Sequence, residues 1–242
     1  MKRAERHRLK QNDLGEITRQ VQDLVSERKR DIGWVVLAVA IVAAVGLGYW
    51  AWSSREQGDA QKLLADAMVI QEARVGPPAA ATGGSGLTFP TERERAQAAV
   101  GKFKAAADAY PATDSGLFAR YQEASTHMVL GNSAEAAKAY QDVVDRAGNR
   151  LIGQTARLGL AGAKARSGQY DQAITAYKEL AQRKDGVLPI DGILMELGRV
   201  YRDAGRAGEA QQTFNRLIEE FPDSTFNADA KRELEALKKA TA

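Results

Sequence analysis

The side chains that could carry out chemistry are few and widely spaced in this sequence. There is no cysteine, so thiol catalysis, thiolate metal ligands and disulfides are excluded. The two histidines, His7 and His127, lie in different parts of the chain, and a lone distal histidine is a weak basis for a Ser-His-Asp site or a metal site. The GGSG run at residues 83–86 lacks the spacing of a phosphate-binding loop. We therefore expect no enzyme, no metal and no cofactor.

The charge distribution separates a short basic tail from a neutral remainder. Residues 1–31 hold 9 Lys and Arg against 6 Asp and Glu, whereas the rest of the chain holds 25 of each. A basic tail of this size suits the anionic surface of a membrane. The neutral remainder gives no support for nucleic-acid binding.

A charge-free apolar segment, residues 32–52, predicts one transmembrane helix. Its 21 residues would extend about 31 Å as a helix, which matches the hydrocarbon thickness of a bilayer. Trp34 near one end and the aromatic cluster at 49–52 are typical of membrane interfaces. Basic residues at 28–30 place the N-terminus in the cytoplasm and the C-terminal portion on the far side. A cleaved signal peptide is the alternative, although its apolar region is usually shorter.

The sequence predicts five segments. They are a cytoplasmic basic tail with a short amphipathic helix at 1–31, the transmembrane helix at 32–52, a further helix at 53–75, a loop rich in Gly, Pro and Ala at 76–91, and a helical domain at 92–242. Thr91 is the expected N-cap of that domain's first helix, which should stop at Pro111. Within the span, Ala40, Ala44 and Gly48 recur every four residues, so they are candidates for contact with a partner membrane helix or a second copy of this chain.

The C-terminal domain repeats with a period of 37 residues. The period relates three glycines, three alanines and three aromatic residues, namely Gly131, Gly168 and Gly205, then Ala136, Ala173 and Ala210, then Tyr140, Tyr177 and Phe214. The glycine permits the positive φ angle that ends a first helix, the alanine lets a second helix pack closely, and the aromatic residue fills the space toward a neighbouring unit. We therefore predict an all-α solenoid of helix-turn-helix units.

These units resemble tetratricopeptide repeats. The last unit carries the family pattern best, at Leu194, Leu197, Gly198, Tyr201, Ala210, Phe214, Leu217 and Pro222. The other units depart from it, with Ala124 and Ala161 at the position of Gly198, and the period exceeds the family's 34 because the loops between units are longer. The resemblance implies a tetratricopeptide-like solenoid, and residues 223–240 are similar to the capping helix that ends such arrays.

The layout of the chain also resembles bacterial membrane proteins with such repeats, namely the ancillary subunit of the Sec translocon and a cell-division coordinator. The first resemblance implies a single-pass protein of the bacterial inner membrane with a periplasmic repeat domain. It also implies contacts with Sec translocon subunits, exported chains or periplasmic chaperones. The alternatives are a scaffold for cell-envelope assembly or cell division, and a self-associating membrane protein.

The family resemblance further implies a peptide-binding groove on the first helices of the units. The family's groove positions correspond here to Phe118, Tyr121, Ser125, Met128, Leu158, Arg166, Met195, Arg199 and Arg202. Aromatic and methionine side chains beside arginines suit an extended or helical peptide with some acidic character. The alternative is that several of these side chains pack against the adjacent unit.

Overall fold

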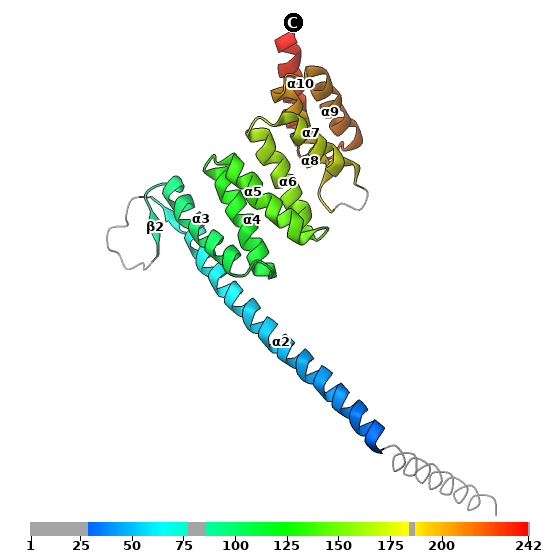
Figure 1. Ribbon diagram of the computed structural model, residues 1–242. Helices are drawn as coiled ribbons and strands as arrows, with labels where there is room; N and C mark the ends of the chain where they lie inside the picture. Colours follow the sequence, from blue (N-terminus) through cyan, green and yellow to red (C-terminus); the bar gives the residue numbers. More distant parts are fainter. Residues whose placement is uncertain (1–28, 77–85, 184–186, 242) are drawn as a thin grey trace, which may run out of the picture. The chain divides into compact units, whose positions relative to one another are not determined.

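The computed structural model describes residues 29–76, 86–183 and 187–241, which are almost entirely helical (Figure 1). Their elements are α2 (Lys29–Gln71), β1 (Arg74–Val75), β2 (Thr88–Phe89), α3 (Glu92–Ala109), α4 (Asp114–Val129), α5 (Ser133–Ala147), α6 (Leu151–Arg166), α7 (Tyr170–Gln182), α8 (Ile190–Asp203), α9 (Ala207–Glu220) and α10 (Asn227–Thr241). The described residues thus hold nine helices and one pair of two-residue strands, which confirms the predicted all-α solenoid. The amphipathic helix expected within residues 1–31 lies outside the described residues.

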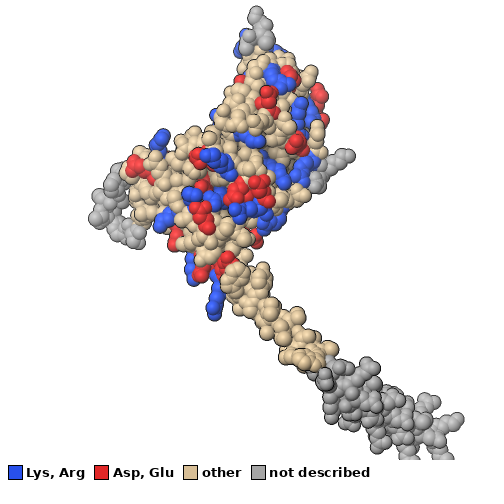
Figure 2. Space-filling view, in the orientation of Figure 1, with Lys and Arg blue, Asp and Glu red and all other residues tan. Residues whose placement is uncertain are grey.

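The chain divides into two compact units, residues up to Arg55 and residues from Glu56 onward. The described part of the first unit is the N-terminal portion of α2, where large apolar side chains between Trp34 and Trp52 are 48–71% exposed. Residues 34–52 include no Asp, Glu, Lys or Arg, and Figure 2 shows this stretch of α2 in tan. Among the described residues, α2 is the one helix that is long and apolar enough to cross a membrane by length and composition. It continues without a break to Gln71, through residues 52 and 53, where a boundary between two segments was expected.

The second unit begins with the C-terminal portion of α2, which packs on α3 through small side chains. Ala67 of α2 is buried with Ala99 and Phe103 of α3. α3 begins at the predicted cap, because the Thr91 hydroxyl accepts a hydrogen bond from the Glu94 N–H at 3.2 Å. It ends at Ala109, two residues before the proline that was expected to stop it.

The segment that was expected to be a loop, residues 76–91, contains a strand. Thr88–Phe89 pairs in parallel with Arg74–Val75, and the Gly76 N–H donates to the Phe89 carbonyl at 2.9 Å. The pairing gives partners to backbone groups on both sides of the loop, which sequence composition does not reveal.

The predicted turn glycines are confirmed in all three helical pairs, α4 with α5, α6 with α7 and α8 with α9. Gly131, Gly168 and Gly205 have φ angles of 81°, 77° and 74°. In the first turn the Gly131 N–H donates to the Met128 carbonyl at 3.2 Å, and the Asn132 N–H donates to the His127 carbonyl at 2.8 Å. This pair of bonds is the Schellman ending of a helix, which requires a left-handed residue and therefore favours glycine.

The second helix of each pair is held against the first by the repeated alanine and aromatic residue. Ala136, Ala173 and Ala210 are fully buried, and Tyr140, Tyr177 and Phe214 are almost so. The aromatic rings occupy space left by missing side chains: a Cβ at Gly198 would lie 2.4 Å from the Phe214 ring, and a Cβ at Gly159 would lie 2.5 Å from the Tyr140 ring. α10 adds Ala230, Leu234 and Leu237 to the last core cluster, as a capping helix does.

Candidate functional site

A hollow of about 440 Å³ lies across the first helices of the three helical pairs. α4, α6 and α8 provide most of its lining, and α5 and α7 provide tyrosines. We call it the central hollow, and its lining consists of Met128, Tyr140, Gly159, Gly162, Ala165, Arg166, Tyr170, Tyr177, Glu196, Arg199, Val200, Arg202 and Asp203. Its size is within the range of sites that hold side chains of a ligand.

The central hollow exists because α6 presents small residues to it. Gly159, Gly162 and Ala165 leave space that larger side chains would occupy. At Gly159 that space is taken by the Tyr140 ring, whereas a Cβ at Gly162 would meet only the Tyr177 hydroxyl at 3.4 Å. The tyrosines of α5 and α7 therefore approach this helix closely, and the space over Gly162 remains open.

An aromatic strip leads from α4 into the central hollow. The rings of Phe118 and Tyr121 stack with centroids 6.4 Å apart, and Tyr121 meets Tyr140 edge-on at 5.5 Å. Phe118 is exposed, Tyr121 is half-buried and Tyr140 is buried, so the strip descends from the surface to the hollow. Such a surface suits the apolar side chains of a bound chain.

The two buried tyrosines of the hollow stay protonated well above neutral pH. Burial, together with the charge effect of Tyr121, raises the pKa of Tyr140 to about 12. A hydrogen bond with Ser125 and the positive charge of Arg166 oppose this rise by smaller amounts. Burial also raises the pKa of Tyr177, and the charge of Glu196 adds to the shift, while Arg166 opposes it. Both hydroxyls therefore keep their proton at physiological pH.

The structure brings only part of the predicted groove residues together. Met128, Arg166, Arg199 and Arg202 line the central hollow, and Phe118, Tyr121 and Ser125 lie on α4 beside it. Leu158 is half-buried and packs against the last core cluster. The prediction for Met195 is wrong, because its side chain is fully buried in that same cluster, to which α10 contributes.

The arginines of α8 are already paired within the chain. Arg202 contacts Glu233 of α10 at 2.5 Å and its neighbour Asp203 at 2.8 Å. Arg199 contacts Glu196 at 2.7 Å and, more loosely, Asp229 and Glu233 of α10 at 3.7 Å each. Sequence reasoning identified α10 as a capping helix but missed these carboxylates, which face α8 at the spacing of one helical turn.

Sequence reasoning also missed the tyrosines and glycines of the hollow as site residues. Tyr140 and Tyr177 had been recognised only as residues that fill gaps between units, and their repeat position does carry that role. The available signal was the pair Gly159 and Gly162 in the middle of a predicted helix. Glycine lowers helix stability there, which points to a packing or functional reason.

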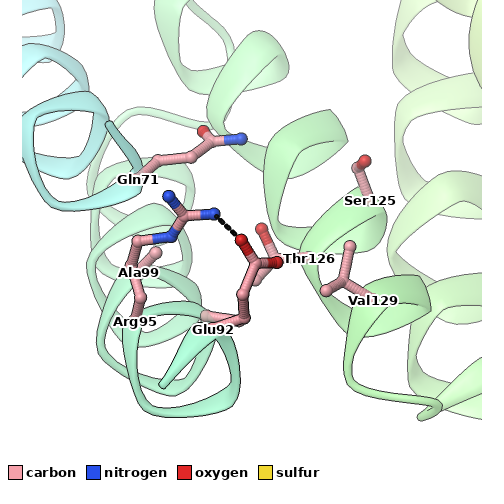
Figure 3. A pocket seen from close by; sticks show the side chains of 8 residues that line it. Gln71, Glu92, Arg95, Ala99, Ser125, Thr126 and Val129 are labelled. Atoms are coloured by element: carbon pink, nitrogen blue, oxygen red, sulfur yellow. Dashed lines mark hydrogen bonds and ion pairs between the residues drawn. The ribbon is translucent and has the colours of Figure 1, made fainter. Parts of the chain in front are cut away.

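A second, smaller hollow of about 60 Å³ lies where α2, α3 and α4 meet (Figure 3). Arg95 enters it from α3, where its guanidinium contacts Glu92 at 3.2 Å and donates to the Ala73 carbonyl at 3.2 Å. Thr126 of α4 donates to the Gln122 carbonyl at 2.7 Å. Because these polar groups have partners inside the chain and the space fits only a few waters, this hollow serves the packing of the three helices.

His127, the histidine of the repeat domain, belongs to a half-buried charged cluster. Its Nε2 lies 4.0 Å from Glu123, whose side chain is 7% exposed. Arg120 is the centre of the cluster, because its guanidinium contacts Asp108 of α3, Glu123 at 2.6 Å and Asp142 of α5 at 3.1 Å. In the described part of the chain no group of three His, Asp or Glu could hold a metal ion. The cluster joins three helices, which is a structural role.

The small residues Ala40, Ala44 and Gly48 lie exposed along α2. Among the described residues no atom lies within 4 Å of the place where a Cβ at Gly48 would be, so none of them requires glycine at this position. The contact of these residues with another helix stays a prediction.

Comparison with known proteins identifies the same type of helical-repeat fold. A family model described as a tetratricopeptide repeat-like domain matches residues 29–239. Two crystal structures of the TPR-like repeats of a putative kinesin light chain from Podospora anserina, one of them a point variant, are similar, with TM-scores of 0.57 and 0.56 at 16% and 15% identity. Each covers 75% of this chain, with 85% and 86% of the other chain covered. At that identity the likeness concerns the fold alone. No curated protein matches the sequence.

Proposed function

This chain belongs to the tetratricopeptide-repeat-like family, and we propose that it is a membrane-anchored scaffold that binds other proteins through the central hollow and its aromatic strip. The observation that carries the proposal is the combination of an open hollow with small residues at its floor and an exposed aromatic approach. Non-catalytic protein binding is the common role of this fold.

The proposed anchor is the apolar portion of α2, residues 32–52. Its large apolar side chains are exposed on every side of the helix. In water this apolar surface would remain in contact with solvent, which is unfavourable. A bilayer would cover it, and the aromatic residues at both ends would lie in the interfaces. By the positive-inside rule we place residues 1–31 in the cytoplasm and the repeat domain outside it, as in a bacterial inner-membrane protein.

Among membrane scaffolds, we favour a role beside the Sec translocon, with exported chains or periplasmic chaperones as ligands of the repeat domain. The layout of tail, span and repeat domain supports this choice. A scaffold for cell-envelope assembly or division uses the same parts and is the second candidate. In a self-associating protein, Ala40, Ala44 and Gly48 would instead contact a second copy of this chain.

The anchor is tested by cysteine labelling, because the chain has no cysteine of its own. Ser26→Cys and Ser133→Cys variants of the full chain are each treated in intact cells with a membrane-impermeant maleimide. We expect labelling at position 133 only. Two results together would contradict the single span. They are equal labelling of the two positions, either both or neither, and release of the protein from membranes by alkaline carbonate.

The partner class is tested by photo-crosslinking in intact cells, with the probe at Ala44 and separately at Tyr121. Translocon subunits captured at Ala44, with exported chains or chaperones at Tyr121, are the expected result. Envelope or division proteins at both positions would favour the second candidate. A crosslink at Ala44 to the protein itself would favour self-association. A probe at the exposed Lys138 of α5, outside the central hollow, is the control for nonspecific capture.

A further inference from the structure

The cations of the central hollow are not equivalent. Arg199 and Arg202 are paired with carboxylates of α8 and α10, so their charge is compensated inside the chain. Arg166 stands at the end of α6 and donates one hydrogen bond, from Nη1 to the Met128 carbonyl at 3.3 Å. In the described part of the chain no carboxylate pairs with Arg166.

The position of Arg166 suits the binding of an anion. Its guanidinium offers further N–H donors in a fixed fork, which matches the two oxygens of a carboxylate. Arg166 is exposed at the surface of the hollow, so the guanidinium stays solvated before a ligand binds and a ligand can reach it from solvent. The hydrogen bond to Met128 directs the side chain from α6 toward α4, where the aromatic strip begins.

The space beside Arg166 suits a large apolar side chain. Gly162 is four residues earlier on α6, so both residues lie on one face of the helix. A Cβ at Gly162 would meet only the Tyr177 hydroxyl at 3.4 Å, and Ala165 adds a second small residue to the floor. Tyr140 and Tyr177 line the hollow and present ring surface together with hydroxyl donors.

On these grounds, and resting on the proposed function, we propose that the central hollow binds a peptide segment that carries an acidic side chain beside a large apolar one. The carboxylate binds Arg166, and the apolar side chain lies over Gly162. Arg166 is thus the residue that selects for negative charge, and Gly162 is the residue that selects for side-chain size. The arginines of α8 keep α10 in place and leave charge selection to α6.

The test uses the full chain in nanodiscs to select from a phage-displayed library of random peptides. Displayed peptides are joined to the coat protein at their C-termini, so any selected carboxylate belongs to a side chain. We expect enrichment of Asp or Glu next to Leu, Ile, Met or Phe. A synthetic peptide of the enriched sequence, amidated at its C-terminus, then provides dissociation constants.

Arg166→Glu should weaken binding of that peptide about ten- to a hundred-fold, because a charge-assisted hydrogen bond is lost and two carboxylates are opposed. In a fresh selection the same variant should enrich Lys or Arg at the acidic position. Arg157→Glu, on α6 but outside the hollow, is the matched control and should leave the selection unchanged. Gly162→Leu should remove the preference for a large apolar residue, whereas Gly208→Leu, on open surface of α9, should not.

The outcomes separate this inference from the proposed function. If the Arg166→Glu variant enriches the same acidic peptides as the natural sequence, Arg166 does not select charge, although the hollow still binds peptides. If the amidated peptide does not bind whereas the same peptide with a free C-terminal carboxylate does, the carboxylate belongs to the chain end and the proposed acidic side chain is wrong. If no peptide is enriched over the empty nanodisc, both the inference and peptide binding by the hollow are overturned.

Discussion

The Phe214 ring fills the place of a missing side chain at Gly198, since a Cβ there would lie 2.4 Å from the ring. Gly198 is in α8 and Phe214 is in α9, so this contact sets how closely the two helices of the last pair approach. The same relationship occurs between Gly159 of α6 and Tyr140 of α5. Missing side chains in first helices are therefore part of the packing of this solenoid.

Gly198→Ala should destabilise the protein by about 1–3 kcal/mol, because the added methyl group overlaps a fully buried ring. The measurement is urea unfolding of the full chain in detergent micelles, monitored by circular dichroism. Gly162→Ala is the matched control in another first helix, where the Cβ has room. It should leave stability unchanged or raise it by about 0.5–1 kcal/mol through helix propensity. Equal midpoints for the two variants would contradict the packing role of Gly198.

Gly205→Val should lower stability by about 1–3 kcal/mol, because φ is +74° at this turn and a β-branched residue is strained there. The space around the position is open, so the loss comes from backbone strain and not from a clash. Gly208→Ala, three residues later and inside α9, is the control and should be neutral or stabilising. The readout is the melting temperature, and an unchanged value for Gly205→Val would refute the turn assignment.

Arg120→Met should lower stability by about 3–5 kcal/mol, because it leaves the buried Glu123 carboxylate without its cation. Arg146→Met is the matched control, because Arg146 pairs with Asp142, another carboxylate of the same cluster, but its side chain is 46% exposed. Its loss should cost about 1 kcal/mol or less. Chemical unfolding of both variants at neutral pH decides the question, and similar losses would mean that burial of the cluster has no energetic consequence.

Acid sensitivity should depend on Asp108. The hydrogen bond from Lys104, followed by that from Arg120, lowers the pKa of Asp108 below its ordinary value of 3.8. Because the folded-state pKa is the lower one, the pairing stabilises the protein above about pH 3.8, and this contribution is lost as the pH falls through the folded-state pKa.

Asp108→Asn should therefore be less stable than the natural sequence at pH 7 and lose less stability on acidification. The difference should stay below about 1 kcal/mol, because the Asp108 side chain is half exposed. Unfolding midpoints at pH 7 and pH 3 measure it, with Asp223→Asn in the exposed segment after α9 as the control. A steeper acid loss in Asp108→Asn than in the control would reverse the expected sign.

The sequence by itself determined the repeat and the turns of this protein. Positive φ angles at Gly131, Gly168 and Gly205 and burial of the alanines five residues later follow from local rules, because a left-handed turn residue and a close helix contact each restrict the side chain that fits. The apolar portion of α2, residues 32–52, could also be recognised from the sequence, because it has no polar face.

Only the tertiary structure decided which groove positions are open. Met195 shares the repeat position of Tyr121 and Leu158, yet it is buried in a core to which α10 contributes, and Arg199 and Arg202 are paired with carboxylates of that helix. A residue's place in the repeat fixes the direction of its side chain. Its exposure and its free charge depend on which helix lies next to it, and that neighbour comes from a distant part of the chain.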